Sequence, residues 1–315
     1  HVCTDDREIY GVIEATCGGG ETALFEIHKQ IYSEAAEWQQ LATNPAVTMD
    51  NVLAAYSGKL WQITGYGTTG VSNYDPLTDA WTAIPASAPP FGQNYARSGC
   101  QYENKVFMYG DSTTPGFTGL WSYDMDTNVW TAETPSGTPP PLTGIWAPAW
   151  VSDPVTHICF MTGGSNTPGT GTLTSVYGFD PLFDSWLPSM PSFTTPRDFH
   201  AAFIFERPAD NHKLLCVAGG NSADLGLTST QCYDFTAAMW YPENADLGVL
   251  PASLWGMGYA TLTADAGDDL WLVNGIDAAY AIANVTWRLN TATGGWEDLG
   301  PLPGGAVYRL SAAVL

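Results

Sequence analysis

One aromatic spacing recurs six times along the chain and constrains the fold more than any other feature. A Trp follows, seven residues later, an aromatic or aliphatic residue that in most units precedes Asp or Asn. The six pairs are Ile31 and Trp38, Tyr74 and Trp81, Tyr123 and Trp130, Phe179 and Trp186, Tyr233 and Trp240, and Leu289 and Trp296. Successive Trp residues lie 43 to 56 positions apart. Such a period predicts a β-propeller in which each repeat forms one blade.

Glycines form a second signal upstream of each Trp, where they follow an alternating apolar stretch. Gly163-Gly164 and Gly219-Gly220 are the clearest copies, and Asn274-Gly275 is a variant. Glycine permits a positive φ angle or a close backbone approach where a strand leaves a crowded centre. We therefore expect a glycine after the second strand of each blade and a Trp at the start of its fourth.

This combination of glycines, Tyr-Asp and Trp resembles the kelch repeat, and the resemblance covers essentially the whole chain. It implies an all-β fold: a six-bladed, kelch-like β-propeller that forms one domain over residues 1–315. In such a repeat the Asp caps a tight turn and the Trp packs between adjacent blades. A calcium site at residues 124–128 is the alternative, but the same pattern at the turn of every blade favours a structural role.

The two ends of the chain together supply one blade. Residues 7–17 carry a second-strand pattern, whereas residues 309–315 resemble the first strand of another repeat at 200–205. We expect the C-terminal strand to complete the N-terminal blade and close the ring, which removes free sheet edges. The predicted blades cover residues 308–315 with 8–42, then 49–85, 95–135, 146–191, 199–251 and 255–304.

The charge excludes two classes of partner. With 32 acidic and 10 basic residues the net charge is −22, so no basic stripe exists to bind nucleic acid or an anionic membrane. No apolar run is long enough for membrane insertion. The first residue, His1, and an even number of cysteines, six, indicate a secreted, extracellular protein.

The cysteines suggest disulfides, and one sequon suggests a glycan. Cys216 and Cys232 flank the Gly219-Gly220 hairpin and suit a cross-strand bridge. The other four cysteines allow three pairings; they are Cys3, Cys17, Cys100 and Cys159. Asn284 begins the one usable N-glycosylation sequon.

A second aromatic series lies where each first strand is expected to begin. Its members occupy matching places 51 to 56 residues apart; they are Tyr95, Trp146, Phe199, Trp255 and Tyr308, with Met49 or Asp50 in the remaining unit. First strands line the channel of a propeller, so we expect an aromatic collar at one mouth. Three arginines lie beside it, Arg97, Arg197 and Arg309. Aromatic faces with nearby polar groups suit sugars, and the arginines suit an acidic ligand. Inward packing as structural filling is the alternative.

Catalytic patterns are sparse. The five His residues show no metal-ligand spacing, and phosphate-loop and nucleophile-elbow motifs are absent. We expect no catalytic residue, no metal and no cofactor. The kelch resemblance raises copper-radical oxidases similar to galactose oxidase, but their Tyr-His ligand pair is missing and Cys232-Tyr233 falls on a structural Tyr. Kelch-like sialic-acid mutarotases remain an enzymatic alternative.

Three functions follow from the sequence. The first is a secreted, non-catalytic propeller that binds a carbohydrate or glycoprotein through the collar. The second is a structural subunit of an extracellular assembly of identical copies. The third is a carbohydrate-active enzyme, either oxidase-like or mutarotase-like.

Overall fold

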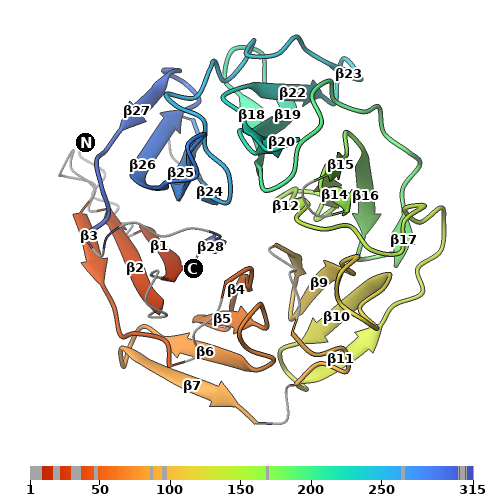
Figure 1. Ribbon diagram of the computed structural model, residues 1–315, viewed down its shortest axis with the longest axis vertical. Coiled ribbons are helices and arrows are strands. Elements are labelled where there is room, and N and C mark those ends of the chain that lie inside the picture. Colours follow the sequence, from red (N-terminus) through yellow and green to blue (C-terminus); the bar gives the residue numbers. More distant parts are fainter. Residues whose placement is uncertain are drawn as a thin grey trace, which may run out of the picture.

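The repeats fold into antiparallel sheets arranged in a ring, as the computed structural model shows (Figure 1). The structure describes residues 9–16, 22–29, 37–45, 49–85, 88–93, 98–167, 170–263, 267–303, 305, 309 and 311–314. All regular elements in these ranges are β-strands. Within the same ranges no helix is long and apolar enough to cross a membrane.

Five four-stranded blades follow one another along the chain, and within each blade the neighbouring strands are antiparallel. The first two blades comprise β4 (Val52–Tyr56), β5 (Lys59–Ile63), β6 (Val71–Asp75) and β7 (Ala80–Ile84), then β8 (Cys100–Tyr102), β9 (Lys105–Tyr109), β10 (Leu120–Asp124) and β11 (Val129–Ala132). The third comprises β12 (Ala149–Ser152), β13 (Cys159–Thr162), β16 (Val176–Asp180) and β17 (Ser185–Trp186). The fourth and fifth comprise β18 (Ala201–Arg207), β19 (His212–Ala218), β22 (Thr230–Asp234) and β23 (Met239–Trp240), then β24 (Gly258–Leu262), β25 (Asp269–Ile276), β26 (Ile282–Asn290) and β27 (Trp296–Asp298).

Two short hairpins extend the loops between the second and third strands of two blades. They pair β14 (Ser165–Thr167) with β15 (Thr170–Thr172), and β20 (Asn221–Ser222) with β21 (Leu225–Gly226).

A further four-stranded sheet joins the two ends of the chain. In it β28 (Ser311–Val314) pairs antiparallel with β1 (Ile9–Thr16), which is followed by β2 (Thr22–Lys29) and β3 (Glu37–Gln40). The predicted all-β propeller is confirmed. Side chains are described for five blades, whereas the sequence predicted six. The remaining repeat is described by the backbone pairing of the sheet that joins the two chain ends. The predicted blade limits and the single domain stay predictions.

The Tyr-Asp and Trp repeat has the structural role predicted for it, as the fourth blade illustrates. Asp234 Oδ1 accepts the Ala237 N–H at 2.8 Å and so caps the turn between β22 and β23. The rings of Tyr233 and Trp240 lie 5.5 Å apart, and Trp240 Nε1 donates to Pro191 O at 2.8 Å, which ties the blade to the segment before it. The same turn bonds recur at Asp75, Asp124, Asp180 and Asn290.

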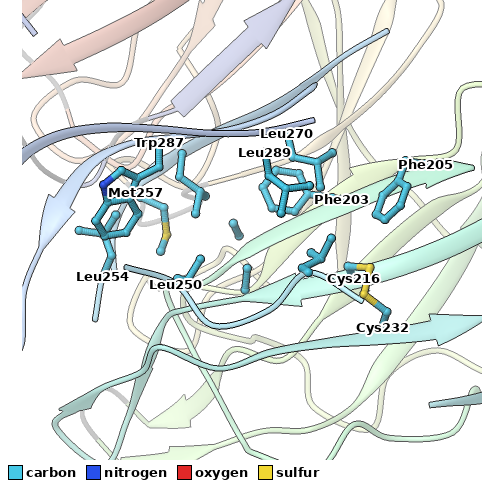
Figure 2. Close-up of a cluster of buried hydrophobic side chains, with 14 of the residues drawn as sticks. Phe203, Phe205, Cys216, Cys232, Leu250, Leu254, Met257, Leu270, Trp287 and Leu289 are labelled. Carbon is cyan, nitrogen blue, oxygen red and sulfur yellow. A yellow bond between two sulfur atoms is a disulfide. The ribbon is translucent and has the colours of Figure 1, made fainter. Parts of the chain in front are cut away.

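Hydrophobic cores lie between neighbouring blades. In Figure 2, Phe203 of β18 packs in one cluster with Leu270 of β25 and with Trp287 and Leu289 of β26. These side chains are at most 3% exposed. Burial of each one contributes about 1.5–3 kcal/mol, so the packing of blade against blade holds the ring together.

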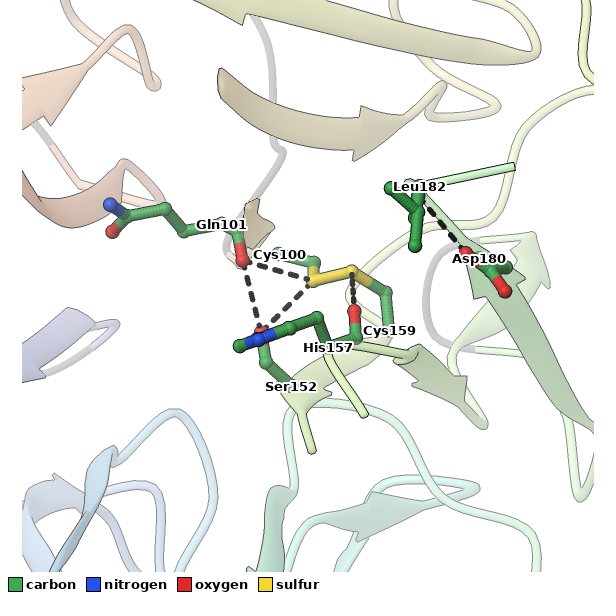
Figure 3. Close-up of a disulfide and its surroundings, with 7 residues drawn as sticks. All are labelled: Cys100, Gln101, Ser152, His157, Cys159, Asp180 and Leu182. Carbon is green, nitrogen blue, oxygen red and sulfur yellow. Dashed lines mark hydrogen bonds between the residues drawn. A yellow bond between two sulfur atoms is a disulfide. The ribbon is translucent and has the colours of Figure 1, made fainter. Parts of the chain in front are cut away.

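Two disulfides reinforce the ring. Cys216 and Cys232 are directly paired residues of β19 and β22, and the bond between them confirms the predicted cross-strand bridge. Cys100 of β8 bonds to Cys159 of β13 and so links two successive blades (Figure 3). This bond identifies one of the three pairings that the sequence left open. Cys3 and Cys17 lie outside the described residues.

Glycines after the second strands allow close backbone approaches, as predicted. Gly220 has φ +96°, and a Cβ there would lie 2.7 Å from Asp198 O. Gly275 has φ +127°, and a Cβ there would lie 2.8 Å from Trp255 O. Gly220 follows β19 and Gly275 lies near the end of β25, and both let the chain press against the segment that leads into the first strand of the blade.

Candidate functional site

Backbone turns at the starts of the first strands form one mouth of the channel. Asp50, Ala147, Phe199 and Arg309 each have a φ between +49° and +59°, and Gly256 has φ +64° at the corresponding place. We call these five residues the mouth ring. Each left-handed residue turns the chain into the channel-lining strand that follows. Non-glycine residues rarely adopt this conformation, so the surrounding structure must hold it.

Hydrogen bonds between successive blades hold the mouth ring. The Phe199 N–H donates to Ala147 O at 3.1 Å, and the Gly256 N–H donates to Phe199 O at 2.9 Å. The Arg309 N–H donates to Gly256 O at 2.7 Å, and the Asp50 N–H donates to Arg309 O at 3.3 Å. The series crosses from the last repeat back to the β4–β7 blade and therefore contributes to ring closure at this mouth.

Four aromatic side chains lie side by side along the mouth ring, and we call them the aromatic row. The ring centroids of Trp146 and Phe199 lie 4.6 Å apart, those of Phe199 and Trp255 5.5 Å, and those of Trp255 and Tyr280 5.8 Å. Phe199 is 3% exposed, Trp146 and Trp255 are half-buried, and Tyr280 is 57% exposed. The row thus has a buried centre and an accessible end, and its neighbouring rings meet edge-on or tilted, at 57° to 90°.

An ion pair fixes the base of the row. The Arg309 guanidinium lies 5.1 Å from the centre of the Phe199 ring, within the range of a cation–π interaction. Arg309 Nε donates to Asp50 Oδ1 at 2.9 Å, and its Nη2 also forms an ion pair with this fully buried carboxylate. Arg309 therefore joins the segment that leads into β28 to the segment that leads into the β4–β7 blade, and contacts Phe199 from one side.

Two acidic residues lie near the exposed end of the row. The Tyr280 hydroxyl donates to Asp224 O at 3.3 Å. The pKa of Tyr280 is raised by partial desolvation and then by the charges of Asp224 and Asp198. Asp198 is buried and accepts a bond from Asn221 Nδ2 at 3.3 Å. Hydrogen-bond acceptors thus lie close to an exposed aromatic face.

Arg197, predicted to lie beside the collar, is fully buried below it. Its Nη1 donates to Gly219 O at 2.8 Å and to Ser229 O at 2.9 Å, and its Nη2 lies 3.7 Å from Glu243 Oε1. Burial lowers its pKa to about 10, and the nearby Glu243 opposes this shift. Arg197 stabilises the loop after β19, so a ligand-binding role for it stays a prediction from sequence alone.

Phe199 lies one residue after the position equivalent to Trp146 and Trp255, although the spacing of the repeats predicts that all three are equivalent. Met49, Trp146, Asp198 and Trp255 form equivalent backbone bridges to the loops after the second strands, so Asp198 rather than Phe199 matches the two Trp residues. Phe199 belongs to the mouth ring. Its ring nevertheless lies between the two indoles, so the structure brings three predicted collar residues together. Tyr95, Arg97 and Tyr308 lie outside the described residues.

Tyr280 is a member of the aromatic row that the sequence does not predict. It lies between β25 and β26, far along the chain from the start of β24, and reaches Trp255 only through the fold. One signal was present: Tyr66, 39% exposed, occupies the corresponding loop of the β4–β7 blade and pairs with Met49. Tyr280 extends the row from the loop between β25 and β26.

Asn284, the predicted glycosylation site, is half-buried beside residue 302. Its Nδ2 donates to Leu302 O at 3.2 Å, and its Oδ1 accepts the Leu302 N–H at 2.8 Å. Glycosylation there stays a prediction. Within the described ranges, no group of three or more His, Cys, Asp or Glu side chains is arranged to hold a metal ion.

The fold resembles that of a solved structure, although the two sequences are only distantly similar. No protein-family model and no curated protein sequence matches the chain. A solved structure described as "Structure of YjhT" superposes with a TM-score of 0.69 over 91% of this chain and 94% of that chain, at 15% sequence identity. A likeness at this identity shows the β-propeller fold alone. The kelch relationship stays a prediction from the sequence.

Proposed function

We propose that the chain is a secreted, non-catalytic propeller that binds a carbohydrate or glycoprotein through the aromatic row. The observation that carries this proposal is the continuous contact from Trp146 through Phe199 and Trp255 to the exposed Tyr280. Sugar rings present apolar C–H faces that stack on aromatic side chains, while their hydroxyls need hydrogen-bond partners.

The polar groups beside the row suit those hydroxyls. Asp224 is exposed and lies within electrostatic reach of Tyr280, and carboxylates are strong hydrogen-bond acceptors. The net charge of −22 favours a neutral or cationic glycan over an acidic one, because Arg309 is already paired with Asp50. Two disulfides are consistent with an extracellular setting.

A glycan array tests this function. Fluorescently labelled protein is expected to bind a restricted set of neutral or amino-sugar glycans. Trp255→Ala and Tyr280→Ala should lose this signal. Phe183→Ala removes an aromatic side chain that is 73% exposed in the turn between β16 and β17, and it serves as the matched control. Unchanged binding by Trp255→Ala would remove the aromatic row from the proposal.

Self-assembly is a second candidate, favoured by exposed apolar residues in the turns between third and fourth strands or at the first position of a fourth strand. These residues are 50% to 94% exposed; they are Leu77, Val129, Leu182, Phe183 and Met239. Apolar groups that recur around one side of a ring suit contact with a second copy. Sedimentation velocity tests this: assembly that persists in a Leu182→Ser/Phe183→Ser variant would argue against these turns.

A further inference from the structure

The channel contains a cavity of about 430 Å³. Its walls are the first strands of the blades, which contribute small side chains such as Ala55, Ala260 and Ala312. These three residues are half-buried. Because alanine is small, they leave space in the channel that larger residues would fill. The volume lies within the range of small-molecule sites, about 300–1,000 Å³.

Tyr259 and Trp150 both line the cavity and contact each other across it. Tyr259 lies on β24, and its hydroxyl donates to Trp150 O at 2.9 Å and accepts the Trp150 N–H at 3.1 Å on β12. The β18–β23 blade lies between these two strands, so the Tyr259 side chain reaches past a whole blade to make these bonds. Cavity residues such as Ser152 and Thr261 follow Trp150 and Tyr259 in their strands, away from Trp146 and Trp255. The cavity is therefore a separate site nearer the opposite mouth.

The cavity is acidic and polar on one side. Among the described residues that line it, Asp268 is the one charged side chain, and Ser152, Thr261 and Thr263 contribute hydroxyls. The pKa of Asp268 is raised by burial and further by the charges of Glu206 and Asp269, while a hydrogen bond with Thr263 opposes the shift. Glu206 and Asp269 thus place further negative charge near Asp268.

Basic groups on the neighbouring strands are already paired. Lys213 Nζ lies 2.7 Å from Asp153 Oδ2, and Arg207 Nη1 lies 2.7 Å from Asp246 Oδ1. Neither cation lines the cavity. A cleft lined by one sign of charge in a strongly acidic protein concentrates ions of the opposite sign.

We propose that the channel cavity binds a compact organic cation, a protonated primary amine on a small apolar body. The ammonium group pairs with Asp268 and donates to the threonine hydroxyls, because it carries three donors. The apolar body lies against the alanine-lined strands. A metal ion fits less well, since the wall offers a single carboxylate and the described residues form no three-ligand cluster.

Ligand-detected NMR titration tests the proposal with cyclohexylammonium chloride and with cyclohexanol, its neutral analogue. We expect saturable binding of the cation and at least about tenfold weaker binding of the alcohol, as a half-buried charge pair predicts. Asp268→Asn should weaken cation binding by about tenfold. Asp298→Asn, which removes an exposed carboxylate on the outer strand β27, should change it less than about twofold.

A second variant tests the cavity independently of charge. Ala260→Leu keeps every carboxylate and fills space in the channel, so it should also weaken cation binding, with circular dichroism confirming the fold. Absence of saturable binding, equal binding of the alcohol, or unchanged binding by Asp268→Asn would each overturn the proposal. The site shares no residue with the aromatic row, so its failure would leave the proposed glycan site unaffected.

Discussion

The disulfide between blades should stabilise the protein more than the disulfide within a blade. Cys100–Cys159 closes a sequence separation of 59 residues, whereas Cys216–Cys232 closes one of 16. Loop-closure entropy in the unfolded chain then predicts contributions of about 4 kcal/mol and about 3 kcal/mol. All four cysteines are at most 1% exposed, so replacement by Ala removes a similar buried volume in each pair.

Equilibrium unfolding in guanidinium chloride without reductant measures this difference. Cys100→Ala/Cys159→Ala should lower the free energy of unfolding by about 1 kcal/mol more than Cys216→Ala/Cys232→Ala. The slope m should rise in both variants, because an unfolded chain with fewer cross-links exposes more surface. Equal losses, or a larger loss in the second variant, would refute the argument that loop length in the unfolded chain decides the order.

Three further substitutions test the polar contacts that hold the ring. Asp234→Asn should lower the free energy of unfolding by about 2–3 kcal/mol at pH 7. Burial raises the pKa of Asp234, but hydrogen bonds from the Ala237 N–H, Tyr241 and His212 outweigh burial and hold this pKa below its usual value. Its stabilisation is therefore present above about pH 4 and lost as the pH falls through the lowered pKa, so pH-dependent unfolding curves of variant and wild type should converge in acid. Asp50→Asn should cost about 2–3 kcal/mol in urea unfolding because it leaves Arg309 without its buried carboxylate, and an unchanged midpoint would contradict the ring-closing role. Tyr259→Phe should cost about 1–2 kcal/mol by differential scanning calorimetry, since it removes both hydrogen bonds to Trp150, and a variant as stable as wild type would show that the contact across the channel contributes little.

The fold could be predicted from the sequence because the motifs that specify it are local and repeated. The Asp of each Tyr-Asp pair caps a turn through backbone groups two or three residues away, as Asp234 does. Its Trp packs on the Tyr that the short turn brings opposite, so eight residues of sequence contain the whole motif. The glycines at the ends of the second strands could also be predicted, because only a residue without a side chain fits at a position such as Gly220.

The site was less readable because it depends on the direction of side chains at chain reversals. Phe199 has a φ of +50°, and this turn places it one step beyond the position that spacing assigned to it. Arg197 precedes the same turn, and its side chain enters the interior rather than the mouth. Tyr280 joins Trp255 through contacts between loops, and no spacing in the sequence encodes such a distance.

Isothermal titration of the strongest array glycan into wild type, Trp255→Ala and Phe183→Ala tests the central claim most directly. The aromatic row predicts at least about a tenfold loss of affinity in Trp255→Ala, because a stacking side chain at the centre of a small site carries much of the binding energy. It predicts wild-type affinity in Phe183→Ala. Equal affinity in all three proteins would contradict the account and place carbohydrate binding elsewhere on the propeller.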